Sequence, residues 1–184
     1  MKTRLDTYNN DWYKPGRSVF IRLVWLFISV LFVQCSWNPV SSIRVMLLRL
    51  FGAHIGKNVT IKPGVHVKYP WFLQIGNSVW IGEKVWIDNL TQVTIGDHVC
   101  ISQGAFVLTG NHDYTRSTFD LMVKPIELKE GVWIGAKSIV CPGVICQSHA
   151  VLTAGSVARN ELQSYTINSG NPALPFKERV IKSE

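Results

Sequence analysis

Cysteine is scarce in this chain of 184 residues, and its spacing argues against two kinds of structural framework. The four cysteines are Cys35, Cys100, Cys141 and Cys146. They form no CxxC pair and have no histidine partner at metal-ligand spacing, so neither a zinc site nor a disulfide framework is expected. A reducing cytoplasm is the simpler location for such a chain.

Dense runs of basic residues are also missing. Lys and Arg outnumber Asp and Glu by 19 to 12, which gives a formal net charge of +7. This balance favours anionic partners such as phosphates, nucleotides or an acidic membrane surface. Because the basic residues are scattered along the chain, we expect no nucleic-acid partner.

No apolar run has the length of a confident membrane span. Residues 19–37 are rich in Trp, Phe, Leu, Ile and Val, but the uncharged part covers only residues 23–35. A bilayer span needs about 20 apolar residues. The run also begins well inside the chain and lacks a small-residue cleavage site, so it does not match a signal peptide. A second apolar helix is expected over residues 41–51.

A period of six residues dominates the middle of the chain. Small aliphatic residues, often followed by glycine, recur at this spacing between Ile55 and Ala158. Such a period fits neither an amphipathic helix nor an alternating strand. It is typical of a parallel β-helix, in which short strands wind in coils and each coil packs on its neighbours. We expect the aliphatic side chains to form the core and the glycines to serve the turns.

The repeats divide the chain into an N-terminal hydrophobic helical segment (1–51), a β-helix domain (52–160) and a C-terminal tail (161–184). Two roles compete for the first segment. It is either a helical cap over the first open coil, which solenoids need, or a membrane-peripheral segment with aromatic side chains at the lipid boundary. The cap is favoured because apolar helical stripes are usually core, and the two roles are compatible where part of the face stays uncovered.

The count of six fails between Val107 and Leu128, which predicts a loop of residues 108–127 extruded from the scaffold. Loops of this kind commonly carry function. The loop contains the sequence Gly-Asn-His-Asp at residues 110–113. Near neutral pH, histidine can accept a proton from an attacking hydroxyl. Taken alone, however, His112 is better explained as a solvated loop residue.

Further motifs follow the hexads and this loop in a fixed order: Gly131–Ala136, Cys141–Val144, Thr153–Val157 and Ser169–Ala173. Together they resemble the hexapeptide-repeat O-acetyltransferases, over about two thirds of the chain. Within that superfamily, the apolar helices that lead into Leu47–Lys57, and then Tyr69-Pro70-Trp71, are similar to colanic acid biosynthesis acetyltransferases.

This resemblance implies an all-β fold, a left-handed parallel β-helix with an N-terminal α-helical segment and an extruded catalytic loop. It implies a homotrimer with active sites between subunits, acetyl-CoA as donor and no metal. The acceptor would be a sugar hydroxyl, free or on a lipid-linked glycan, in exopolysaccharide or other cell-surface glycan biosynthesis. The protein would be cytoplasmic, with or without peripheral contact to the inner membrane face. His112 would be the general base.

The resemblance also implies a donor-binding set. Ala136 and Ala154 lie where relatives pass the pantetheine arm along the coils, and both are small enough for close approach. Arg159 and Lys177 align with polar and basic cofactor contacts, although ordinary solvated charges explain these two equally well.

Catalytic support or acceptor binding is expected from Asp88, Asn89, Asn111 and Asp113. A partner for the second ring nitrogen of His112 is needed because the tautomer decides which nitrogen accepts the proton. Asp113 from the same loop, and Asp88 or Asn89 from the preceding coil, are rival candidates. Cys146 takes an inward aliphatic position in the repeat, so we interpret it as a core residue and not as a nucleophile.

Alternatives from other classes remain open. The chain could be a soluble acetyltransferase of free sugars or xenobiotics, or a β-helix protein that is either non-catalytic or zinc-binding. Zinc would need three convergent ligands, commonly histidines. The remaining histidines show no close ligand motif and are expected at the surface or in turns: His54, His66, His98 and His149.

Overall fold

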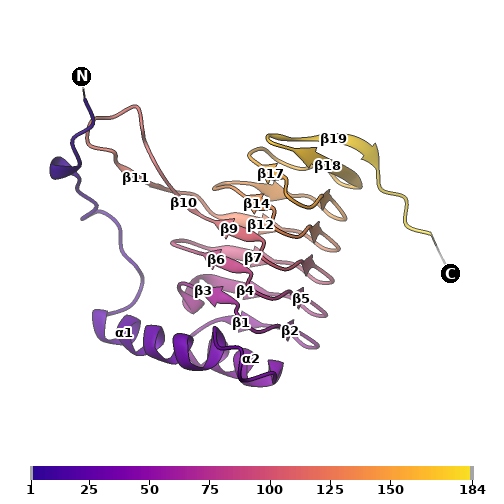
Figure 1. The fold of residues 1–184 in the computed structure, drawn as a ribbon, viewed down its shortest axis with the longest axis horizontal. Coiled ribbons are helices and arrows are strands. Elements are labelled where there is room, and N and C mark those ends of the chain that lie inside the picture. The colour runs from indigo at the N-terminus through magenta and orange to yellow at the C-terminus, as the bar shows by residue number, and fades with distance from the viewer. Residues whose placement is uncertain (1, 183–184) are drawn as a thin grey trace.

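The computed structural model describes residues 2–182 and shows a solenoid of short strands with two helices across one end (Figure 1). Three parallel sheets run along the solenoid, and each coil contributes one short strand to each of them. The first, sheet A, consists of β1 (His54–Ile55), β4 (Leu73–Ile75), β7 (Val93–Ile95), β12 (Ile126–Leu128) and β15 (Ile145–Cys146). This arrangement confirms the parallel β-helix expected from the period of six.

The other two sheets complete the triangular coil. Sheet B consists of β2 (Thr60–Ile61), β5 (Trp80–Ile81), β8 (Cys100–Ile101), β13 (Trp133–Ile134), β16 (Val151–Leu152), β18 (Thr166–Gly170) and β19 (Ala173–Glu178). Sheet C consists of β3 (His66–Val67), β6 (Trp86–Asp88), β9 (Phe106–Leu108), β14 (Ile139–Val140) and β17 (Val157–Ala158).

The core is a set of stacked aliphatic columns, one for each sheet. In sheet B, Ile61 pairs with Ile81, Ile81 with Ile101 and Ile101 with Ile134, and all four side chains are buried. Each coil therefore buries its apolar face only against adjacent coils, as in other solenoids.

Glycine has two separate roles in the repeat, and only one of them is the expected turn role. The glycine directly after the aliphatic residue, such as Gly76 or Gly135, lies against the backbone of the next coil, where an added Cβ would lie 2.8 Å from Asp97 N or 2.5 Å from Ala154 N. The left-handed turn residue comes two positions later. It is glycine in Gly104, with φ +66°, but a histidine in His98 and His149, with φ +57° and +61°. These two histidines are thus turn residues.

The number of residues between the inward position of one sheet and that of the next differs between corners. From sheet A to B and from B to C, the inward residues are six apart in every coil. From sheet C to A, the step is eight from Val67 to Ile75 and from Ile87 to Ile95, and six from Val140 to Cys146. We call the turn from sheet C to sheet A the C–A corner and the turn from sheet B to sheet C the B–C corner. The C–A corner is therefore enlarged in the coils nearest the helices.

The N-terminal region covers the first coil. It contains η1 (Leu5–Thr7), α1 (Val19–Ile28), the π-helical turn η2 (Ser29–Val33) and α2 (Ser41–Leu50); a further 3₁₀ turn, η3 (Pro70–Phe72), lies in the C–A corner. Trp25 of α1 is buried and donates its indole N–H to the carbonyl of Val67, at 3.0 Å. Ser41 at the start of α2 accepts from the backbone N–H of Ile61, at 2.8 Å. In residues 2–182, no helix has the length and apolar character needed to cross a membrane.

Arg44 of α2 is fully buried and holds the helical cap together. Its guanidinium donates to the backbone carbonyls of Val33 and Val40, at 3.1 and 3.3 Å, and also to those of Cys35 and Asn38. Within the described residues no carboxylate lies at ion-pair distance from it. The carbonyl of Val33 ends η2 and has no intrahelical partner of its own, and those of Cys35 and Asn38 lie in the turn between η2 and α2.

The C-terminal tail contributes to the solenoid. Strand β18 pairs in parallel with β16, and β19 folds back on β18 as an antiparallel strand. Arg179 then donates to the carbonyls of Gly131 and His149, at 2.8 and 3.0 Å. The hairpin thereby covers the last coil at the end opposite the helices (Figure 1).

Candidate active site

The interruption in the repeat forms a hairpin that leaves the solenoid at the C–A corner. Strands β10 (Gly110–His112) and β11 (Leu121–Val123) pair antiparallel, with His112 opposite Leu121. Gly110 at the base of the hairpin packs closely on the preceding coil, because a Cβ there would lie 2.5 Å from the side chain of Leu90 and would displace it. Strand pairing and this close contact together fix the start of the segment that carries the histidine.

The ring of His112 is held by Phe119 at the far end of the same hairpin. Its Nδ1 atom lies 2.9 Å from the carbonyl oxygen of Phe119, and the two rings are stacked with centroids 4.5 Å apart and planes 8° apart. A carbonyl oxygen can only accept a hydrogen bond, so Nδ1 carries the hydrogen. In the neutral ring, Nε2 then keeps its lone pair and is the atom able to accept a proton.

The neighbouring loop residues stabilise the hairpin. Asn111 accepts from the backbone N–H of His112, at 2.8 Å. The Asp113 carboxylate accepts from the backbone N–H and hydroxyl of Thr115 and lies 3.7 Å from Arg116. The hydrogen bonds from Thr115 are the main reason that the pKa of Asp113 is lowered. Asp113 therefore stabilises the turn at the end of the loop. The observed partner of the His112 ring is a backbone carbonyl.

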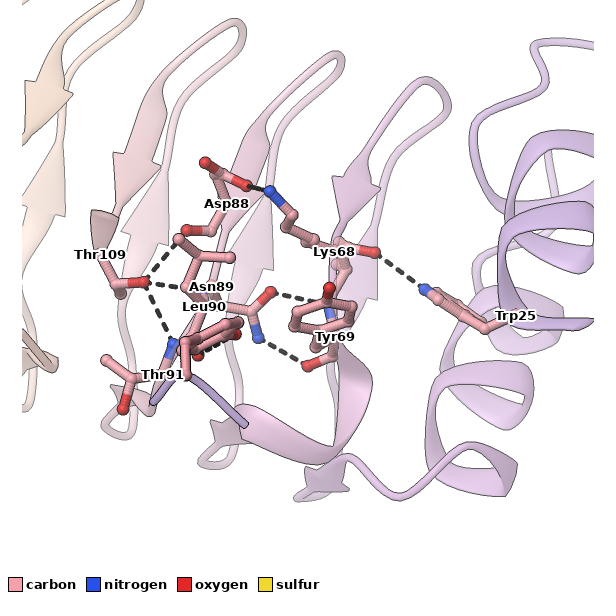
Figure 2. A network of polar contacts seen from close by, with 10 residues as sticks. Trp25, Lys68, Tyr69, Asp88, Asn89, Leu90, Thr91 and Thr109 are labelled. Atoms are coloured by element: carbon pink, nitrogen blue, oxygen red, sulfur yellow. Dashed lines mark hydrogen bonds and ion pairs between the residues drawn. The ribbon is translucent and has the colours of Figure 1, made fainter. Parts of the chain in front are cut away.

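Asp88 and Asn89 belong to a polar network along the C–A corner (Figure 2). Asp88 forms an ion pair with Lys68, at 2.9 Å. Asn89 is fully buried; its Oδ1 accepts from Tyr69 N, at 3.0 Å, and its Nδ2 donates to Tyr69 O, at 2.7 Å. In the enlarged corner, the Asn89 side chain thus forms the hydrogen bonds between coils that backbone groups form in the sheets. Within the described part of one chain, neither residue is a hydrogen-bond partner of His112.

Thr109 connects this network to the histidine loop. Its hydroxyl accepts from the backbone N–H of Leu90, at 2.8 Å, and lies 3.2 Å from the carbonyl of Asp88 (Figure 2). No site role was predicted for Lys68, Tyr69 or Thr109, although Tyr69 belongs to the Tyr69-Pro70-Trp71 motif. The spacing of eight residues between inward positions at this corner could have indicated them, because it marks two coils in which a longer segment replaces the regular turn.

An N-terminal arm, residues 2–17, runs beside the loop and was also missed (Figure 1). The backbone N–H of Arg4 donates to the carbonyl of Ser117, at 2.7 Å. The ring of Tyr8 lies 5.7 Å from that of His112. Further along, Tyr13 donates its hydroxyl to the carbonyl of Leu90, at 2.7 Å, and burial raises its pKa. No repeat or motif marks this polar stretch, so its position could not be read from the sequence.

Ala136 and Ala154 lie together in a groove of about 360 Å³ at the B–C corner. The groove is lined by Ser102, Gln103, Trp133, Gly135, Ala136, Val151, Leu152, Thr153 and Ala154. Adjacent coils are joined there by the hydrogen bond from Gly155 N to Ala136 O, at 2.8 Å. Arg159 and Lys177 are exposed and lie outside this lining set, so one chain does not bring them into the groove.

The groove and the histidine lie at different corners of the same chain. The groove follows sheet B, whereas the hairpin of His112 follows sheet C. The six-residue step across sheet C corresponds to roughly 20 Å of extended chain. Within one chain, the groove of Ala136 and Ala154 and the side chain of His112 therefore lie apart, although both are expected in the active site.

Cys146 and the remaining titratable groups show no reactive or metal-binding arrangement in residues 2–182. Cys146 is fully buried, and burial raises the pKa of its thiol to about 12, so it is not the thiolate that a nucleophile requires. No group of three or more His, Cys, Asp or Glu side chains in this range could hold a metal ion.

Comparison with known proteins places the chain among acetyltransferases. No family model matches it. The Escherichia coli K12 protein named "Putative colanic acid biosynthesis acetyltransferase WcaF" is 36% identical over 170 residues, covering 91% of this chain and 92% of that protein. Galactoside O-acetyltransferase of the same organism is 28% identical over 138 residues, covering 73% of this chain and 68% of that protein.

Solved structures agree on the fold. A hexapeptide-repeat-containing acetyltransferase of Vibrio cholerae, crystallised with acetyl coenzyme A, superposes with a TM-score of 0.79 at 24% identity, covering 90% of this chain and 92% of that one. The expected left-handed parallel β-helix is thereby confirmed, and the 36% identity to WcaF along nearly the whole chain identifies the activity class. The chain belongs to the hexapeptide-repeat acetyltransferase family and is an acyltransferase.

Proposed function

We propose that the protein is an acetyl-CoA-dependent O-acetyltransferase that acetylates a sugar hydroxyl in the biosynthesis of an exopolysaccharide or other cell-surface glycan, with His112 as general base. The observation that carries the proposal is the 2.9 Å contact between His112 Nδ1 and the Phe119 carbonyl. It leaves Nε2 as the proton acceptor, on a loop that leaves the scaffold. The names of the relatives, one for colanic acid and one for galactosides, support the sugar acceptor.

In this mechanism, His112 accepts the proton of the acceptor hydroxyl at Nε2 while the hydroxyl oxygen attacks. Bound acetyl-CoA supplies the acetyl group as a thioester, which is the electrophile. The imidazolium of His112 then returns the proton to the departing sulfur, so the base is regenerated in each cycle. The Phe119 carbonyl stabilises both steps, because its hydrogen bond to Nδ1–H persists while the ring is charged.

The groove at the B–C corner suits the donor. Its volume is about 360 Å³, and the small side chains of Ala136 and Ala154 leave room for an extended chain. Because His112 of the same chain lies at another corner, the donor groove of one subunit needs the histidine of a neighbour. This separation supports a homotrimer with sites between subunits, since three copies related by a threefold axis bring unlike corners together.

We propose a cytoplasmic location with the helical end at the membrane face. Several apolar side chains of α1 are exposed there, including Phe20, Leu23 and Phe27. Residues 1–51 carry seven Lys or Arg and two Asp or Glu, so most of the net charge of +7 lies in this segment. An apolar helical face within a segment of net positive charge is suited to an anionic bilayer interface.

Transfer of radiolabelled acetyl groups tests the function. Wild-type protein would be incubated with acetyl-CoA and a panel of free, nucleotide-linked and lipid-linked glycans, with the His112→Ala and His54→Ala variants run alongside. Label transfer by wild type and His54→Ala, but not by His112→Ala, is the expected result. Equal transfer by all three proteins would reject His112 as the base, and no transfer from acetyl-CoA by the folded wild type would reject the donor.

A further inference from the structure

A second cavity, of about 350 Å³, lies between α1 and the strand β3 of the first coil. Its walls are mainly apolar: Leu23, Trp25 and Leu26 from the helix, and Val67 from the coil. It lies within the range of ligand pockets, about 300–1,000 Å³, towards the lower end. Leu23 and Leu26 are also exposed, so the cavity is continuous with the apolar outer face of α1.

Cationic side chains border this cavity. Arg22 and Lys68 both line it, one from each wall. The Nε atom of Arg22 is buried and has no hydrogen-bond partner in residues 2–182, and no carboxylate in that range is within ion-pair distance of Arg22. The guanidinium of Arg22 thus places a charge without a carboxylate partner at the lining of the cavity, and this favours an anionic ligand. Lys68 is partly neutralised by Asp88, which leaves Arg22 as the main anion-binding group.

The cavity is connected to the histidine loop by the C–A corner. Lys68 is paired with Asp88 in the next coil (Figure 2). Asp88 in turn lies opposite Leu108 in the coil after that. Neighbouring strands are about 4.8 Å apart, so these two steps span about 10 Å. The hairpin of His112 begins two residues after Leu108. An anionic group at the Lys68 side of the cavity would therefore lie within a few sugar lengths of the base of this hairpin.

From this arrangement we propose that the acceptor glycan is carried on a phosphate-linked lipid. The first part of the lipid chain occupies the cavity between α1 and β3, the phosphate contacts Arg22, and the glycan extends along the C–A corner to His112. The inference rests on the proposed function and specifies its acceptor. It also gives the exposed face of α1 a purpose, because a lipid can pass from the bilayer into the cavity along that face.

Calorimetric titration with dodecyl phosphate, below the concentration at which it forms micelles, tests the site without the natural acceptor. Arg22→Gln removes the proposed phosphate contact, and Leu26→Trp fills the cavity. Arg17→Gln and Phe27→Trp are matched controls, since Arg17 and Phe27 are exposed and do not line the cavity. Circular dichroism verifies that each variant is folded, and acetyl-CoA binding is measured on the same samples.

Saturable binding of one dodecyl phosphate per subunit is expected, weakened about tenfold or more by either cavity variant and little changed by either control. The proposal fails if dodecyl phosphate does not bind, if the controls weaken binding as much as the cavity variants, or if coenzyme A displaces the lipid. It also fails if inorganic phosphate binds equally well, because the site would then not recognise the chain. Acetyl-CoA binding without dodecyl phosphate binding would overturn the lipid site alone, whereas the converse would overturn the acetyltransferase proposal on which it rests.

Discussion

The carbonyl oxygen of Phe119 lies 2.9 Å from Nδ1 of His112, while the two side chains stack face to face. Phe119 has φ +53°, a left-handed conformation that is unusual for a bulky residue. The turn that imposes it is held by the hydrogen bond from Phe119 N to Arg116 O and by the pairing of Asp113 N with Asp120 O. The orientation of the histidine thus depends on the backbone of the hairpin and not on an acidic side chain.

The tautomer of His112 is the first prediction. With Nδ1 bonded to a carbonyl, the neutral ring should carry its hydrogen on Nδ1 and leave Nε2 unprotonated. Nitrogen-15 NMR of the ring, recorded under conditions in which it is neutral, distinguishes the two forms. An unprotonated Nδ1 would contradict the assigned contact.

Substitution of His112 should affect chemistry more than folding. We expect His112→Gln to lower kcat about 100-fold or more, since general bases typically contribute 10²–10⁴-fold. His54→Gln, at an exposed histidine of the first coil, is the matched control and should keep its activity. Thermal melting of both variants would show whether a loss reflects unfolding.

Filling the groove at the B–C corner should block the donor. Ala154→Trp places a large ring in the 360 Å³ groove, so we expect acetyl-CoA binding to weaken at least about tenfold while the protein stays folded. Val180→Trp adds the same side chain at an exposed site outside the groove. Equal affinities in calorimetry of the two variants would show that the donor binds elsewhere.

Arg44 should be important for stability although it forms no ion pair in residues 2–182. Arg44→Met leaves the carbonyls of Val33 and Asn38 buried without this donor, so the free energy of unfolding should fall by about 2–4 kcal/mol. Arg49 on the same helix also donates to carbonyls, but at an exposed position. Urea denaturation of Arg49→Met should show a loss below about 1 kcal/mol. A similar loss in both variants would contradict the role assigned to the buried guanidinium.

Cys146 should make stability depend on alkaline pH. Its thiol has a folded pKa of about 12, above the ordinary value near 9 that the unfolded chain retains. The unfolded state therefore binds fewer protons between these values, and this contribution lowers stability as pH rises above 9, by up to about 1.4 kcal/mol per pH unit. Comparing the pH dependence of denaturation for wild type and Cys146→Val isolates the effect. An unchanged dependence in Cys146→Val would contradict it.

Much of the fold was predictable because the core repeats. Inward positions such as Ile75, Ile81 and Ile87 recur every six residues, a spacing that fits a β-helix and neither an amphipathic helix nor an alternating strand. The reason for the glycine that follows the inward aliphatic residue was harder to predict. Gly76 is required by the backbone of the adjacent coil, a contact between residues about 20 positions apart, whereas the turn conformation tolerates His98.

The site was predictable only where it is encoded locally. The interruption of the six-residue repeat and the Gly-Asn-His-Asp sequence predict the loop of His112 from the sequence alone. The partner of its ring could not be predicted, because the Phe119 carbonyl has no side-chain signature and reaches the ring only when the hairpin forms. The arm beside Tyr8 could not be predicted either, since its contacts with the histidine loop join residues more than 100 positions apart.

The number of residues between inward positions is constant at the B–C corner and variable at the C–A corner. The first corner therefore cannot change length, whereas the second can. An insertion at the B–C corner would displace an inward residue such as Val140 from its column and disturb the groove beside it. The C–A corner already accommodates steps of six and eight residues and an entire hairpin. With the donor at the B–C corner and the acceptor at the C–A corner, as proposed, a change in the length of the C–A corner would alter the acceptor and preserve donor recognition, so we expect length variation among relatives to concentrate there.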